Sequence, residues 1–213
     1  MNENDREVRA RDGAGRYRRI APLYDFLELP FELARYQPLR RMLFRGLSGR
    51  VLDAGVGTGR NMPFYPGGAD VTGIDLSPEM LARAERRRMR LGAAAHLLQR
   101  NVCDTGFADE TFDAVVASFL FCVIPEEQLL PALRELARVC KPSGELRLLE
   151  YTRPRKPWRR FLTRLWEPWV RGVFGASFDR DIERLLPAAG LELVDGRYVV
   201  DELIRYTVAR PHK

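Results

Sequence analysis

The sequence predicts an α/β fold built on a seven-stranded, mostly parallel sheet that ends in an antiparallel hairpin. Short apolar runs alternate with segments of helical periodicity, which is typical of parallel sheets covered by helices. A cluster of glycines directly follows the first of these runs. The last two runs are separated only by a turn at residues 201–202, so we expect them to pair antiparallel. The length of 213 residues fits one domain.

The N-terminal part is predicted to be helical. Residues 1–15 are polar and charged, and we expect a flexible arm there. In residues 16–47, apolar and aromatic side chains recur at helical spacing and are interrupted by prolines. This pattern predicts a cap of short helices, which opens a single domain spanning residues 16–213.

After this cap, strands and helices alternate. We expect strands at residues 50–54, 70–75, 95–100, 112–118, 144–151, 191–198 and 203–210. We expect helices at residues 58–65, 78–91, 126–140, 157–174 and 179–188. Residues 151–174, which include the helix expected at 157–174, would form a lid or membrane-facing insertion beside the sheet.

Composition and charge exclude several classes of protein. No apolar run reaches the roughly 20 residues that a membrane-spanning helix needs. The polar first residues give no sign of a secretory signal, so we expect a cytoplasmic protein. The three cysteines and two histidines lack ligand spacing, and we expect buried thiols and no metal. The net charge is +6: residues 1–50 carry +4, residues 151–172 carry +6 and residues 51–150 carry −3.

The glycine cluster follows the first predicted strand in the segment Val51–Asn61. Asp53 ends that strand, and Gly55, Gly57 and Gly59 follow. Glycines let the backbone turn tightly and approach a ligand where a Cβ atom would collide. Between a strand and a helix they predict a Rossmann-like nucleotide site, the alternative being a plain connecting turn. The spacing differs from the GxGxxG of dinucleotide sites, which argues against a nicotinamide enzyme.

A second acidic residue, Asp75, ends the next predicted strand. A carboxylate at this place can accept hydrogen bonds from both hydroxyl groups of a ribose. Ser77 is predicted to cap the following helix, with Pro78 in its first turn. Leu76 and Met80 can pack against an adenine ring.

A third segment, Asn101–Val116, resembles the pattern D-A-x-x-L-P-F-x-D-x-x-F-D. That pattern belongs to the family of small-molecule S-adenosylmethionine-dependent methyltransferases that includes quinone-biosynthesis enzymes. Aligning on Phe107 and Phe112 places Asn101 where the family has its adenine-binding acid, and Asp104 is the alternative. The resemblance implies S-adenosylmethionine as cofactor, with Asp53 facing its amino group through water. The amide of Asn101 and the N–H of Val102 would then bind adenine.

The resemblance covers about residues 16–210 and includes the pattern Tyr17-x-x-x-Ala21-x-x-Tyr24-Asp25. In the family this part packs over the cofactor. It implies that Tyr17 contacts the cofactor and that Tyr24 lies on the substrate side; the alternative is a buried helix stripe. The complete set of candidate cofactor-binding residues is Tyr17, Asp53, Gly55, Gly57, Gly59, Asn61, Asp75, Leu76, Met80, Asn101, Val102 and Ser118.

The methyl acceptor is indicated by residues 150–174, which begin at the carboxyl end of a predicted strand. Open α/β sheets bind ligands at that edge. Aromatic and apolar side chains recur there at spacings of three and four, and arginines occupy the other faces. This pattern predicts either an interfacial membrane helix or a lid that packs its stripe on the domain.

Within the family, this region is most similar to bacterial phospholipid N-methyltransferases, which convert phosphatidylethanolamine stepwise to phosphatidylcholine. The similarity implies a monomer at the inner, anionic face of the membrane with a phospholipid acceptor. The alternatives are a quinone precursor or another lipophilic small molecule, including a thiol, and a non-catalytic membrane-binding protein. No nucleic-acid recognition motif is present. Glu150, Tyr151 and Tyr24 are candidates to receive the acceptor's proton, and Arg153 or Arg180 to hold a phosphate.

Overall fold

The computed structural model describes residues 36–152 and 181–212, which form one seven-stranded sheet in the order β3-β2-β1-β4-β5-β7-β6. Neighbouring strands from β3 to β5 pair parallel, and β7 pairs antiparallel with both β5 and β6. The strands are β1 (Arg50–Ala54), β2 (Asp70–Asp75), β3 (His96–Gln99), β4 (Phe112–Ser118), β5 (Cys140–Tyr151), β6 (Leu191–Val200) and β7 (Ile204–Pro211). The predicted fold class is confirmed, including the C-terminal hairpin.

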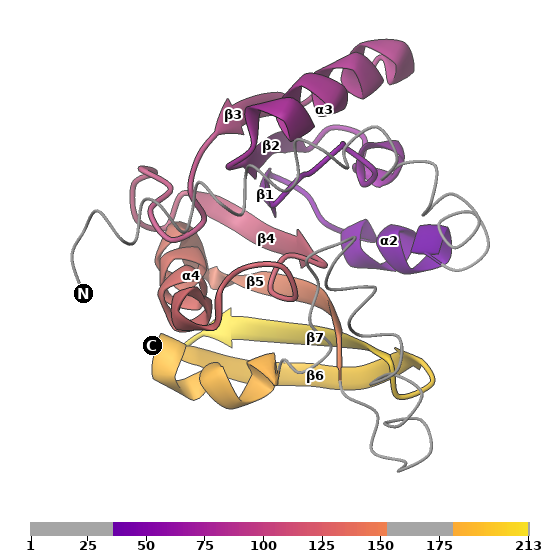
Figure 1. The fold of residues 1–213 in the computed structure, drawn as a ribbon. Coiled ribbons are helices and arrows are strands. Elements are labelled where there is room, and N and C mark those ends of the chain that lie inside the picture. The colour runs from indigo at the N-terminus through magenta and orange to yellow at the C-terminus, as the bar shows by residue number, and fades with distance from the viewer. Residues whose placement is uncertain (1–35, 153–180, 213) are drawn as a thin grey trace.

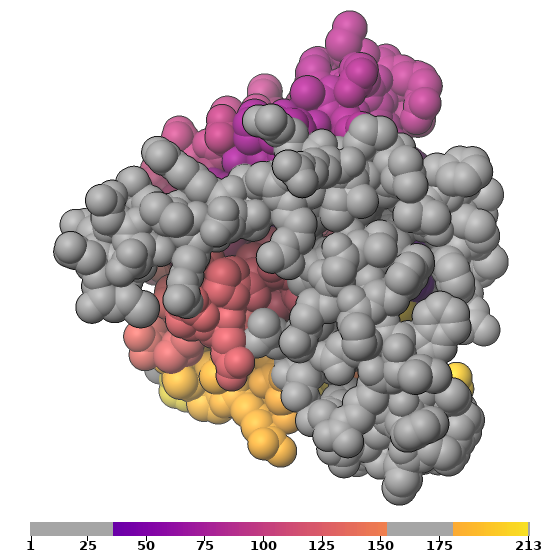
Figure 2. All heavy atoms as spheres, viewed as in Figure 1, coloured from indigo at the N-terminus to yellow at the C-terminus, as the bar shows by residue number. Residues whose placement is uncertain are grey.

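Within residues 36–152 and 181–212, three α-helices lie against this sheet (Figure 1): α2 (Gln37–Phe44), α3 (Pro78–Leu91) and α4 (Glu126–Val139). The predicted cap on α3 is confirmed, because the Ser77 hydroxyl accepts the Met80 N–H at 3.2 Å. In the space-filling view, α4 lies between α3 and the C-terminal residues on the visible face (Figure 2).

Two predicted helices are wrong in the described residues. In place of a helix at 58–65 there is only the 3-10 turn η2 (Met62–Phe64), because glycines at 55, 57 and 59 hold positive φ angles and Pro63 follows. In place of the helix at 179–188 there are two 3-10 turns, η3 (Ile182–Leu185) and η4 (Pro187–Ala189), which Pro187 separates. Strand β5 also begins at Cys140 rather than at 144.

Alternate residues of the central strands face opposite sides of the sheet, as the pleat requires. Leu52 and Val115 belong to one buried apolar cluster together with α4. Val51 and Val116 belong to a second cluster together with Leu43 of α2 and Leu149 of β5. The sheet is therefore covered on both faces, and its strand ends are fixed relative to the helices.

Helix α2 is fastened to the sheet through its last carbonyl groups. One guanidinium nitrogen of Arg147 donates to the Leu43 carbonyl at 2.9 Å and to the Arg45 carbonyl at 2.7 Å. Figure 1 shows α2 beside the carboxyl end of β4, where Arg40 of α2 donates a hydrogen bond to Ser118. Within the described residues, no helix has both the length and the apolar character to cross a membrane.

Candidate cofactor and acceptor site

The predicted site residues gather at the carboxyl edge of the parallel strands. Asp53 lies near the end of β1, Asp75 ends β2, Ser118 ends β4 and Glu150 lies near the end of β5. Parallel strands bring these ends to the same side of the sheet, which is where α/β folds bind their ligands.

The three glycines after β1 are needed for different reasons. All three have positive φ angles, between 55° and 79°. A Cβ atom on Gly55 would lie 2.8 Å from the Leu120 side chain, and one on Gly59 would lie 2.7 Å from Met62. Among the described residues, a Cβ atom on Gly57 would meet no atom closer than 4.0 Å, so this part of the structure leaves the surface beside Gly57 open. A ligand can therefore approach the backbone there.

Asp75 joins this glycine loop to the second strand. Its Oδ2 accepts the Gly57 N–H at 2.9 Å, and its Oδ1 accepts the Ser77 N–H at 2.9 Å. Burial is the largest influence on its carboxyl group and raises the pKa above the usual value. Each carboxylate oxygen can accept a second hydrogen bond, so Asp75 keeps the capacity to receive ribose hydroxyls.

Asp53 is fully buried inside a side-chain network. Its oxygens accept the Asn61 amide at 2.9 and 3.0 Å and the Tyr65 hydroxyl at 2.6 Å. Burial raises the pKa of Asp53 to about 6, although both hydrogen bonds and the nearby Arg40 charge act in the opposite direction. Burial therefore disfavours the charged form of Asp53, and a nearby cation favours it.

The cation in the described structure is Arg40 of α2, which the sequence did not indicate. Its guanidinium donates to Asn61 Oδ1 at 2.8 Å and to the Ser118 hydroxyl at 3.1 Å. Arg40 is buried, with 6% of its surface exposed. It connects α2 to the ends of β1 and β4, so the predicted residues Asp53, Asn61 and Ser118 form one network with it.

The adenine segment begins directly after β3. The Asn101 carbonyl accepts the Asp104 N–H at 3.1 Å, and the Asn101 side-chain oxygen accepts the Cys103 N–H at 2.9 Å. The Arg100 N–H donates to the Asp75 carbonyl at 3.1 Å, which places this turn beside Asp75. Asn101 and Asp104 are both exposed, and Val102 is buried. The choice between Asn101 and Asp104 stays a prediction.

The two apolar candidates beside Asp75 differ in exposure. Leu76 is 44% exposed, whereas Met80 is buried and has only 5% of its surface exposed. Leu76 is thus available to cover a ring from outside. Met80 is a buried residue in the first turn of α3, the helix that Ser77 caps.

Glu150 binds the loop that follows β4. Its Oε1 accepts the N–H groups of Leu120 and Phe121 at 2.8 and 2.9 Å, and its Oε2 accepts that of Cys122 at 3.2 Å. Burial raises the pKa of Glu150 to about 7 despite these three donors. Both carboxylate oxygens of Glu150 therefore already accept hydrogen bonds from the backbone of this loop.

An aromatic cluster lies beside this loop and consists of Tyr36, Phe119 and Tyr151. The two phenol oxygens are 2.8 Å apart. The Phe119 ring centroid lies 5.3 Å from that of Tyr36 and 4.8 Å from that of Tyr151, and the Arg40 guanidinium lies 5.5 Å from it. Phe119 has a φ of 55°, a conformation that is strained for a bulky residue. Such strain occurs mainly at functional sites.

Four predicted residues, Tyr17, Tyr24, Arg153 and Arg180, lie outside the described residues, as do the arm and the predicted lid helix. Across residues 36–152 and 181–212, no cluster of acidic, histidine or cysteine side chains could hold a metal ion. Cys122 and Cys140 are buried and Cys103 is half-buried.

The arrangement fits a ligand that carries both adenosine and an amino acid. The open surface at Gly57 admits a ligand next to the backbone, the Asp75 carboxylate lies where ribose hydroxyls bind, and Asp53 offers a buried anion. The aromatic cluster lies at the ends of β4 and β5 and can form the wall of an acceptor site.

Comparisons with known proteins agree with this interpretation of the cofactor site. A domain family described as "Methyltransferase domain" matches residues 51–144. A phosphatidylethanolamine N-methyltransferase from Cereibacter sphaeroides is 42% identical over 139 residues, which are 63% of this chain and 66% of that protein, slightly less than two thirds of its length.

A second relative and a solved structure extend the comparison. A demethylmenaquinone methyltransferase from Tropheryma whipplei is 32% identical over 198 residues, which are 88% of this chain and 77% of that protein. The crystal structure of a SAM-dependent methyltransferase from Aquifex aeolicus matches 91% of this chain and 97% of its own, with a TM-score of 0.66 and 22% identity. At that identity the likeness shows a shared fold.

Proposed function

Because this chain belongs to the family of S-adenosylmethionine-dependent methyltransferases, we propose that it methylates the amine of phosphatidylethanolamine and of its mono- and dimethyl derivatives. The observation that carries this proposal is the 42% identity to a phosphatidylethanolamine N-methyltransferase. The charge of the chain supports it, since residues 151–172 carry +6 and would meet an anionic bilayer.

The reaction asks the protein mainly to position the two reactants. The cofactor, when bound, supplies a methyl group on a sulfonium; the acceptor nitrogen forms a bond to that methyl carbon as the carbon–sulfur bond breaks. Before this the acceptor ammonium must lose a proton. Tyr151 is the described candidate nearest to such a role, because its phenol oxygen is held 2.8 Å from that of Tyr36. Tyr24 stays a candidate from the sequence.

Glu150 was a candidate for the same proton, and its surroundings favour another role. Three backbone N–H groups occupy its carboxylate, and only 4% of its surface is exposed. We therefore propose that Glu150 is a positioning residue. It holds the loop of residues 120–122 and thereby the strained Phe119 that precedes it.

The proposal includes a place in the cell. A monomer would lie at the cytoplasmic face of the membrane, attracted by the basic segments, with Arg153 or Arg180 binding the phosphate of the lipid. We propose no nucleic-acid partner.

The proposal can be tested by incubating the purified chain with S-adenosylmethionine and vesicles that contain phosphatidylethanolamine and phosphatidylglycerol. Mass spectrometry of the extracted lipids should show mono-, di- and trimethylated products in succession. Transfer stops at the third methyl group, because a quaternary nitrogen has no lone pair. Tyr151→Phe should lower turnover about tenfold or more if the phenol serves proton transfer. Tyr198→Phe, on the edge strand β6 that β7 separates from β5, should not.

One control variant removes cofactor binding. Gly57→Val places a side chain in the open surface beside the cofactor and should abolish all transfer. The absence of any methylated phospholipid, together with transfer to another acceptor, would refute the phospholipid proposal.

A quinone precursor is the second candidate acceptor. It is favoured by the demethylmenaquinone methyltransferase relative, whose match extends over 77% of that protein's length. The same assay with a demethylated quinol, and with a lipophilic thiol, distinguishes these acceptors. Cofactor binding without transfer to any of them would favour a non-catalytic role.

A further inference from the structure

The chain between β3 and β4, residues 100–111, contains no helix or strand but follows the side of α4 closely. Loops of this length without regular structure are usually functional. The loop contains the Asn101–Asp104 turn, which is predicted to bind the adenine of the cofactor. Its connections to α4 therefore matter for the cofactor.

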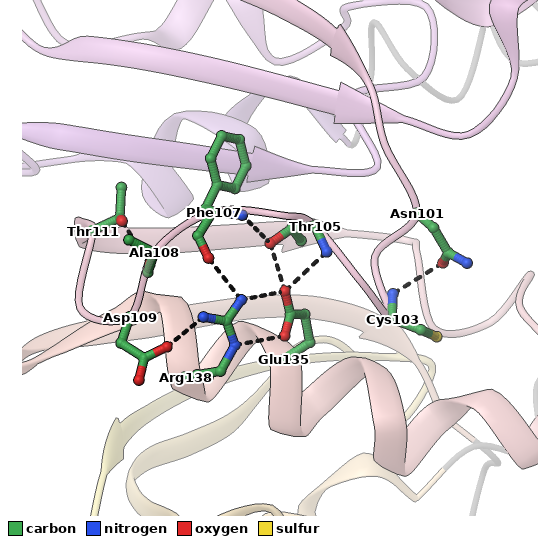
Figure 3. A network of polar contacts seen from close by, with 9 residues as sticks. All are labelled: Asn101, Cys103, Thr105, Phe107, Ala108, Asp109, Thr111, Glu135 and Arg138. Carbon is green, nitrogen blue, oxygen red and sulfur yellow. Dashed lines mark hydrogen bonds and ion pairs between the residues drawn. The ribbon is translucent and has the colours of Figure 1, made fainter.

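Glu135 and Arg138 of α4 bind this loop together (Figure 3). Glu135 Oε1 accepts both the N–H of Thr105, at 2.8 Å, and its hydroxyl, at 2.6 Å. Arg138 donates to the Phe107 carbonyl at 2.9 Å and to Glu135 at 2.7 Å, and it also pairs with Asp109. Thr105 is completely buried, so its bonds to Glu135 are shielded from water.

The charges of Glu135 and Arg138 keep the hydrogen bonds between α4 and this loop intact at neutral pH. The hydrogen bond from Arg138 is the largest cause that lowers the pKa of Glu135, to about 2. The same ion pair raises the pKa of Arg138. Both groups are therefore charged, and hydrogen bonds to charged groups are stronger than those between neutral ones.

The bound residue Thr105 directly follows the adenine turn. Asp104 closes that turn through its N–H to the Asn101 carbonyl, and Cys103 donates its N–H to the Asn101 side chain. On the other side, the Arg100 N–H fixes the turn to Asp75. The turn is thus anchored at one end by the sheet and at the other by α4.

We propose that Glu135 and Arg138 are positioning residues that hold Asn101 and Val102 in place to recognise the adenine of the cofactor, without touching it themselves. A turn that is already ordered binds more tightly, because its ordering entropy is not lost on binding. The inference depends on the cofactor of the family and not on the methyl acceptor.

The test measures binding of two ligands by calorimetry in the absence of any acceptor. One is S-adenosylhomocysteine, and the other is its analogue without the 6-amino group of adenine. The wild type should prefer the amino compound, and Glu135→Ala should reduce that preference by about tenfold, the worth of one good hydrogen bond. Glu135→Gln keeps an oxygen for Thr105 and should retain more of the preference. Arg138→Met should show a smaller preference for the amino compound than the wild type does.

Arg134→Ala is the matched control, because Arg134 lies on the exposed side of α4 and donates to Ala188, away from the loop. It should leave the preference unchanged.

Two results would overturn the proposal. One is an equal loss of affinity for both ligands, which indicates general destabilisation; the other is unchanged affinity for both. If Glu135→Ala does not fold, as urea unfolding would show, Glu135→Gln and Arg138→Met decide the question. Failure of phospholipid methylation would not affect this outcome, because no acceptor is present.

Discussion

Asp53 combines complete burial with a carboxyl group that titrates near neutrality. Its partners Asn61 and Tyr65 are neutral donors, and the Arg40 charge reaches it through Asn61. Burial is the dominant influence and raises its pKa to about 6. Asp53 is therefore mostly charged at pH 7, and a cation such as the amino group of the cofactor would favour the charged form further.

This property predicts that cofactor affinity depends on pH. Below about pH 6 Asp53 is protonated and no longer attracts the amino group, so the dissociation constant of S-adenosylhomocysteine should rise as pH falls from 7 to 5. The rise should approach tenfold per pH unit at its steepest, which is the limit for one titrating group. Calorimetry across this range measures it.

Asp53→Asn provides the control, because its side chain does not titrate. The affinity of this variant for S-adenosylhomocysteine should be weak and nearly independent of pH. Glu150, whose pKa lies at about 7, titrates in the same range. A slope that persists in Asp53→Asn would assign the pH dependence to Glu150 and contradict the role given to Asp53.

Among single residues, the sequence predicted the acids and glycines of the site together with Asn61 and Ser118, but it did not predict Arg40, Tyr36 or Phe119. Asp53 and Asp75 stand at fixed places after apolar strands, so a local pattern finds them. Arg40 lies 13 or more residues before these motifs in an arginine-rich chain, and nothing local distinguishes it. Tyr36 and Phe119 come together only through tertiary packing, which no spacing in the sequence reports.

Helix α2 acts on the site as a whole element, because it brings a guanidinium to the ends of β1 and β4. Pro38 lies in its first turn, and Arg147 binds its last carbonyl groups. Leu43 and Phe44 pack in the core on the same face. The position of Arg40 is therefore fixed by the packing of the helix and not by a flexible loop.

We predict that Arg40→Gln shifts the pH dependence of cofactor binding upward. Arg40 lowers the pKa of Asp53 by its charge, so its removal should raise that pKa further. The midpoint of the affinity curve should then move above that of the wild type, and affinity at pH 7 should fall. Arg41→Gln is the control, because Arg41 is exposed on the same helix and lies over Phe64. An unchanged midpoint in Arg40→Gln would contradict the coupling.

The sequence predicted the strands more accurately than the helices. All seven strands were found: the buried central parallel strands are short apolar runs bounded by turn residues, and a turn separates the last two, antiparallel strands. The helix expected at 58–65 failed because its apolar spacing competed with three glycines in left-handed conformation. The early start of β5 was missed because Cys140 and Lys141 continue a helical pattern; only pairing of Cys140 with Phe112 reveals the strand.

Charge is distributed unevenly over the whole molecule. The segment of residues 51–150, which contains most of the described cofactor site, carries −3, whereas residues 151–172 carry 7 basic and 1 acidic side chain. Such separation does not stabilise a fold, but it directs a protein towards an anionic surface. The membrane proposal thus depends on this distribution rather than on any apolar span.

We predict that the protein binds vesicles containing phosphatidylglycerol and does not bind vesicles of phosphatidylcholine alone. Flotation should show binding that weakens as salt rises, because surface charges are screened within about 10 Å at 0.1 M salt. The double variant Arg159→Gln, Arg160→Gln should weaken binding, since each surface arginine contributes about 1 kcal/mol. The matched double variant Arg86→Gln, Arg90→Gln removes the same charge from α3 and should bind like the wild type. Equal weakening of vesicle binding in the two double variants would mean that only the net charge of the protein matters. Binding that does not depend on the charge of the lipid would favour a lid that packs on the domain, and with it a soluble acceptor.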